Sequence, residues 1–154
     1  MQHQLDSRFR EIAVFVARLG SEPIPDDIKS YLVRFGTVLI CGYVERSVEI
    51  IILSRLSTRA HPRVLEFIKS HFQRGRNLDC GAIEQLLARF DPEWYRSFSK
   101  FIEQNPDVKE GISSCYAVRN SVAHGGSGNV GINRLNELLQ ISQRLIDGII
   151  RSTT

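Results

Sequence analysis

The chain has 154 residues, of which 42% are hydrophobic and 24% charged, so it can form one domain with its own core and is not disordered. Its formal net charge of +3 is compatible with a polyanionic partner but does not require one. The three cysteines are widely spaced and form no C-x-x-C pair, so nothing indicates a zinc site or a disulfide framework. Buried, reduced thiols are expected.

The start of the chain and its most apolar segment bear on localisation. Residues 1–12 are polar, unlike a signal peptide. Residues 38–53 are the most apolar stretch, but they contain Glu45, Arg46 and Glu49 and therefore do not resemble a membrane span. We expect a soluble, cytoplasmic protein that does not enter a membrane.

Apolar residues recur at helical spacing along most of the chain. Residues 5–19 predict a first helix ending at Gly20, and residues 26–57 predict a long second helix that is apolar almost all round in its middle. Gly36 and Gly42 would either bend this helix or allow a neighbour to pack closely. Residues 62–72, 79–90 and 92–104 predict three shorter helices, the last two separated by Pro92.

Two further helices follow. Asn105 as N-cap and Pro106 as first helical residue predict the start of a helix that runs to the segment RNSVAHGG, residues 119–126. Asn133 is predicted to cap a last helix reaching Ile150. Strand patterns, repeats and domain linkers are absent from the sequence. The predicted fold is all-α, a single antiparallel helical bundle over residues 1–154.

Arg119 falls on the buried face of the penultimate helix. That face is defined by apolar residues at helical spacing, namely Val108, Ile112, Cys115 and Val122. An unpaired buried charge is costly, so Arg119 needs an acidic partner, a polar cleft or an anionic ligand. Glu45 and Glu49 on the second helix are the candidate partners. A structural salt bridge, which Arg46 could join, and a ligand-binding arginine both remain open at this point.

Two polar residues accompany Arg119. His124 falls at the C-terminus of the same helix, where Gly125 provides a stop signal. A histidine there can act as a cap, and imidazole can also transfer protons near neutral pH. Asn120 supplies an amide that can orient a histidine or a phosphate oxygen, or simply face solvent.

Arg119, Asn120 and His124, in RNSVAHG, resemble the signature of the HEPN superfamily, and the chain is most similar to the RiboL-PSP-type HEPN domains. The order of elements agrees, with an acidic residue, Glu45 in GYVERSVE, on an early core helix. The motif closes a later helix, and a glycine-bearing loop and a final helix follow. The similarity covers most of the chain from about residue 25 onward.

The resemblance implies a metal-independent endoribonuclease that needs no cofactor and works as a homodimer on RNA. His124 would act as general base or acid, Arg119 would stabilise phosphoryl charge, Asn120 would hold the phosphate or His124, and Glu45 would orient Arg119. The products would carry 2′,3′-cyclic phosphate and 5′-hydroxyl ends. Such enzymes serve as toxins or phage-defence effectors controlled by an antitoxin or regulatory protein. Gly126 stands where family toxins silenced by a nucleotidyltransferase carry a tyrosine, so that mode of control is not expected here.

A second basic cluster, HFQRGRN, contains His71, Arg74, Arg76 and Asn77. It could follow an RNA backbone, or it could be a helix end with favourable positive charge. For the whole chain, two alternatives to the enzyme stay open. One is a non-catalytic HEPN-like module that binds RNA or protein, and the other is a helical adaptor with an apolar docking surface.

Overall fold

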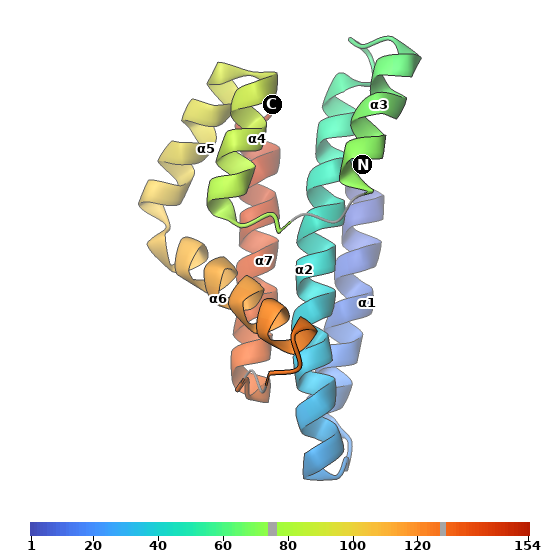
Figure 1. Ribbon diagram of the computed structural model, residues 1–154, viewed down its shortest axis with the longest axis vertical. Helices are drawn as coiled ribbons and strands as arrows, with labels where there is room; N and C mark the ends of the chain where they lie inside the picture. The colour runs from blue at the N-terminus through green and yellow to red at the C-terminus, as the bar shows by residue number, and fades with distance from the viewer. Residues whose placement is uncertain (74–76, 127–128) are drawn as a thin grey trace.

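The computed structural model describes residues 1–73, 77–126 and 129–154, and the regular structure in these ranges is entirely helical (Figure 1). The predicted all-α class is therefore confirmed. The helices are α1 Gln2–Ser21, α2 Asp26–Leu56, α3 Pro62–Phe72, α4 Cys80–Phe90, α5 Pro92–Gln104, α6 Pro106–Ala123 and α7 Ile132–Ser152.

Helix α2 is the centre of the bundle and packs against α1, α6 and α7 (Figure 1). Helix α1 runs antiparallel to α2, whereas α7 runs in the same direction as α2, so the two chain termini lie at the same end of the molecule. Helices α4 and α5 pack on each other, and α5 also covers α7. Of the described helices, α3 packs closely only against α2.

Small residues on α2 and α6 set how closely the helices approach. A Cβ at Gly36 would lie 2.7 Å from Leu135 Cδ2, so this glycine lets α7 pack against α2. A Cβ at Gly111 of α6 would lie 2.6 Å from Ile141 Cδ1, again on α7. Gly42 has no neighbour within 4 Å of such a Cβ, so it provides no close contact. Gly111 thus lets the motif-bearing α6 pack closely against α7.

The predicted helix starts are correct at three prolines and wrong at one asparagine. Pro62, Pro92 and Pro106 each open a helix as expected. Helix α7 begins one residue before Asn133, because Gly131 takes the extended N-cap conformation. Asn105 does occupy the N-cap position of α6, but its side chain donates to the Phe101 carbonyl and accepts from Arg144 instead of capping the helix.

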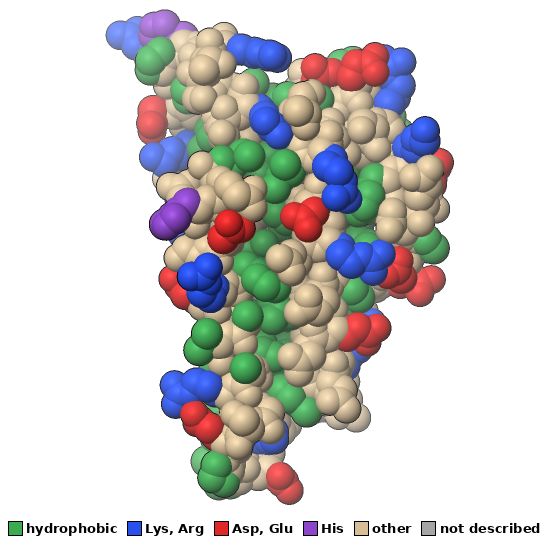
Figure 2. All heavy atoms as spheres, turned by 180° about the vertical axis from the view of Figure 1, so that it is seen from behind, with side chains coloured by type: hydrophobic (Ala, Val, Ile, Leu, Met, Phe, Trp, Pro, Cys, Tyr) green, Lys and Arg blue, Asp and Glu red, His purple; other side chains and the backbone are tan. Residues whose placement is uncertain are grey.

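Several large apolar side chains remain at the surface. On the N-terminal half of α2, Ile28, Tyr31 and Phe35 are spaced along one side of the helix and are 49%, 68% and 50% exposed. On α3, Phe67 is 65% exposed. Figure 2 shows a further apolar strip along the long axis of the face that carries α1 and α7, flanked by charged side chains. Apolar faces of this kind on a small domain indicate contacts with other molecules.

Candidate active site

The segment that carries the motif ends α6 with a well-defined turn. The Gly126 N–H donates to the Ser121 carbonyl at 2.8 Å, and the Gly125 N–H donates to the Val122 carbonyl at 3.1 Å. This is the hydrogen-bond pattern of a Schellman motif, and Gly125 has the positive φ of 77° that such a stop requires. The predicted glycine stop is confirmed. It leaves His124 as the C-cap residue, with an exposed side chain.

Arg119 is half-buried, one turn before the end of α6. Its Nη1 donates to Oδ1 of Asn77, from the loop before α4, and to Oδ1 of Asn120 at 3.3 Å. The Asn77 Nδ2 donates to the same Asn120 oxygen at 3.3 Å. The three side chains therefore form a closed hydrogen-bonded triangle, in which two neutral amides hold the guanidinium in place.

Glu45 was expected to contact Arg119 or lie near it, and the structure places it near Arg119 without an ion pair among the described residues. Among the described residues, no carboxylate lies within 4.0 Å of the Arg119 guanidinium. Glu49 is buried and pairs with Arg46 on its own helix, so it is not the partner of Arg119. Glu45 is half-buried and near enough to Arg119 to feel its charge, but it makes no direct contact with it.

Burial raises the pKa of the Glu45 carboxyl above its ordinary value, and the nearby Arg119 charge and Tyr116 hydroxyl offset only part of this rise. One carboxylate oxygen of Glu45 and the hydroxyl of Tyr116 are buried without a hydrogen-bond partner among the described residues. Burial likewise raises the pKa of Tyr116. Glu45 and Tyr116 thus form a poorly solvated layer beneath Arg119.

The raised pKa of Glu45 leads to a prediction about stability. Because the unfolded chain ionises this carboxyl more readily than the folded protein does, the wild type should lose stability as the pH rises above the ordinary value of 4.5. Glu45→Gln should therefore be more stable than the wild type at neutral pH and equally stable at about pH 4. Urea unfolding at both pH values measures this, with the exposed Glu110→Gln on α6 as control. A variant less stable than wild type at neutral pH would show that the Arg119 charge outweighs burial.

His124 and Arg119 are not hydrogen-bonded to each other in the described chain. The His124 ring makes no hydrogen bond to any side chain that the structure describes, whereas Arg119 is directed to Asn77. The two residues are five positions apart on one helix, which turns the chain by about 140° and places them on different sides. The His124 side chain is therefore exposed at the helix end, on another side than Arg119.

The second basic cluster is described only in part. His71 lies on the last turn of α3, and its Nδ1 is 3.1 Å from the Phe67 carbonyl. Its ring and the Phe67 ring meet edge-on, with centroids 4.5 Å apart. Arg74 and Arg76, also expected to contact RNA, lie outside the described residues.

Two features of the site were not predicted. Asn77 was seen only as part of a basic cluster, and the structure makes it the partner of Arg119. Cys41 and Cys115 were expected to be buried free thiols, which is confirmed, but their sulfur atoms also meet at 3.5 Å between α2 and α6. This contact with Cys115, together with burial, raises the pKa of Cys41. Cys41 lies one turn before Glu45, and Cys115 lies one turn before Arg119, so the pair packs under the site.

The described residues contain neither a metal-ligand cluster nor a membrane-spanning helix. Within residues 1–73, 77–126 and 129–154, no three His, Cys, Asp or Glu side chains gather as metal ligands. In the same ranges, no helix has both the length and the apolar character needed to cross a bilayer.

The site thus combines a guanidinium held by two amides with an exposed histidine at the end of the same helix. Comparison with protein families agrees with this architecture. The family model described as RiboL-PSP-HEPN matches residues 3–154, almost the entire chain. The chain belongs to the RiboL-PSP family of HEPN domains, as its motif predicted. Comparisons with curated proteins and with solved structures gave no match.

Proposed function

We propose that the protein is an endoribonuclease that cleaves RNA through attack of a 2′-hydroxyl on the adjacent phosphate. The observation that supports this most directly is the environment of Arg119. Its hydrogen-bond partners, Asn77 and Asn120, are neutral, so its positive charge is not cancelled by a contacting carboxylate among the described residues. A guanidinium that is held in place and not paired with a carboxylate can bind the negative charge of a phosphoryl group. In a structural salt bridge, the carboxylate would neutralise that positive charge.

The proposed step needs no nucleophile from the protein. The 2′-oxygen forms a bond to phosphorus, the bond to the 5′-oxygen breaks, and the ends are a 2′,3′-cyclic phosphate and a 5′-hydroxyl. His124 takes the proton from the 2′-hydroxyl or gives a proton to the leaving 5′-oxygen. Arg119 stabilises the charge on the phosphoryl oxygens, Asn77 and Asn120 hold Arg119 in position, and the nearby Glu45 on α2 helps to orient it.

We further propose that two protomers complete each site. His124 projects from the end of α6 without a described partner, while Arg119 of the same chain points elsewhere. An isologous dimer would bring the His124 of one chain to the Arg119 of the other. The exposed apolar stripe formed by Ile28, Tyr31 and Phe35 lies on α2, the helix that packs against α6, and it provides surface for such an interface.

The proposed biological setting rests on the family to which the chain belongs. An enzyme that cuts cellular RNA would arrest growth, so we propose a toxin or defence effector that an antitoxin or regulatory protein restrains. Gly126, two residues after His124, has no side chain that a nucleotidyltransferase could modify, so control by that route is not expected. A Cβ at Gly126 would lie 2.5 Å from Ser121 Oγ, so this position also has no room for a larger residue without a shift of the turn.

The proposal is tested by incubating purified protein with mixed cellular RNA in EDTA. We expect cleavage by the wild type, because the 2′-hydroxyl mechanism does not require a metal-activated water, and almost none by His124→Ala. The exposed His3→Ala on α1 serves as the matched control and should cut like the wild type. A wild type that binds RNA without cutting it would instead support the non-catalytic HEPN-like module.

A further inference from the structure

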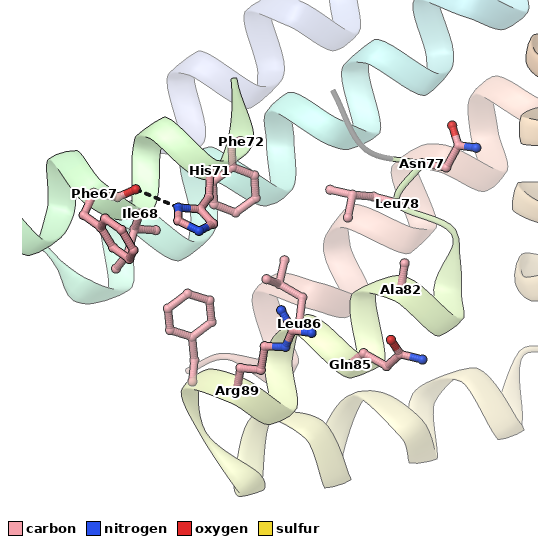
Figure 3. A pocket seen from close by; sticks show the side chains of 11 residues that line it. Phe67, Ile68, His71, Phe72, Asn77, Leu78, Ala82, Gln85, Leu86 and Arg89 are labelled. Atoms are coloured by element: carbon pink, nitrogen blue, oxygen red, sulfur yellow. Dashed lines mark hydrogen bonds between the residues drawn. The ribbon is translucent and has the colours of Figure 1, made fainter. Parts of the chain in front are cut away.

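A pocket of about 330 Å³ lies between α3 and α4, directly beside the proposed active site. Figure 3 shows side chains of α3 on one side and of α4 on the other, with His71 and Arg89 facing each other across the gap. Leu78 points into the pocket from the connecting segment. The volume is at the lower end of the range for small-ligand sites and suits one planar ring system.

The pocket and the Arg119 site share one residue. Asn77 forms one end of the pocket, and its amide is directed away from the cavity (Figure 3). That amide accepts the hydrogen bond from Arg119. A group bound at this end of the pocket and a phosphate bound by Arg119 would therefore lie on opposite sides of the Asn77 side chain.

The walls of the pocket have the chemistry that bases prefer. Phe67 and Phe72 from α3 and Phe90 from α4 supply aromatic surface. Arg89 supplies a planar guanidinium, and His71 can add a second positive charge. None of the described lining residues is acidic. Aromatic rings and guanidinium groups stack on unpaired bases, and a lining without carboxylates does not repel the phosphates that accompany a base.

The outer wall of the pocket is only partly used by the fold. Phe72 and Phe90 pack against the core, but α3 buries no residue fully, and Phe67 is 65% exposed with its ring against that of His71. We infer that the α3–α4 pocket is a subsite for a nucleobase of single-stranded RNA, next to the phosphate held by Arg119. This inference rests on the proposed function for the location of the phosphate. It adds a base-binding requirement that the Arg119–His124 motif alone does not contain.

The test measures binding of a short 2′-O-methyl RNA, which the proposed mechanism cannot cleave, by fluorescence anisotropy. Phe67→Ala and Arg89→Ala should each weaken binding about fivefold or more, because base stacking is lost. Val64→Ala, also exposed on α3, and Arg96→Ala on α5 are the matched controls and should bind like the wild type. All four positions are exposed, so the variants should fold, which thermal unfolding verifies.

A set of oligonucleotides, each with one abasic position, identifies the base. Removing the base at one position should weaken binding to the wild type. It should not weaken binding to Phe67→Ala any further, because the base and the Phe67 ring form the same contact. Equal binding by wild type, Phe67→Ala and Arg89→Ala would overturn the subsite. So would a change of oligomeric state in Phe67→Ala by light scattering, which would make the pocket a protein interface. The wild type could show a base position whose effect depends on Phe67 and yet cut no RNA. That result would support the subsite and contradict the ribonuclease proposal.

Discussion

Replacing His124 or Arg119 by alanine should lower the rate of RNA cleavage by about 100-fold or more in each case. His124→Ala removes the proton-transfer group, and Arg119→Ala removes the charge that faces the phosphoryl oxygens. Because both act in the same chemical step, the double variant should be little worse than either single one. Single-turnover cleavage of a defined oligonucleotide measures these effects.

Folding should not account for this loss. His124 is exposed and contributes little to packing, so the thermal unfolding of His124→Ala should match that of the wild type. Removing Arg119 leaves the amides of Asn77 and Asn120 near the surface, where water can replace the lost bonds. Arg96→Ala is the control for loss of an exposed arginine. If both single variants cleaved RNA at rates within a few-fold of the wild type, Arg119 and His124 would have no role in the cleavage step.

Mixing the two inactive single variants should restore cleavage that neither has alone. If Arg119 of one protomer works with His124 of the other, a mixed dimer of Arg119→Ala and His124→Ala chains contains one complete site. The expected gain is therefore large compared with the activity of each variant. The measurement is the cleavage rate after the two proteins have been unfolded and refolded together, against each refolded separately.

The restoration should depend on the dimer interface. Adding Tyr31→Ser and Phe35→Ser to both chains removes exposed apolar surface from α2 and should abolish it, with a shift towards monomer in light scattering. No recovery in a mixture that light scattering shows to be dimeric would mean that each protomer uses its own Arg119 and His124. The end of α6 would then have to rearrange when RNA binds, because Arg119 and His124 of one chain lie on different sides of the helix.

The helices could be predicted because their signals are local. Pro62, Pro92 and Pro106 each mark a first helical turn, and Gly125 marks the end of α6, all of which the structure confirms. The signal is misleading at Asn133, where an asparagine close to a helix start predicts a cap that the structure does not show. Gly131 allowed the helix to begin earlier, and no side chain caps it.

The partner of Arg119 could not be predicted in the same way. The sequence shows that an arginine on a mostly apolar helix face needs compensation, and the argument from charge favoured Glu45 or Glu49. The structure instead uses Asn77, which is 42 positions away in the chain and reaches Arg119 only because the start of α4 packs beside α6. Local patterns contain no information on such a contact, since it depends on how α4 is placed by the bundle.

The most direct test of the account compares two oligonucleotides cut by the purified wild type in EDTA. One is all RNA, and the other carries a single 2′-deoxy sugar at the mapped cleavage position. We expect cleavage of the first to 2′,3′-cyclic phosphate and 5′-hydroxyl ends, and no cleavage of the second at that position. Cleavage of the 2′-deoxy oligonucleotide at the same position and rate would contradict it, because the proposed nucleophile would then be absent.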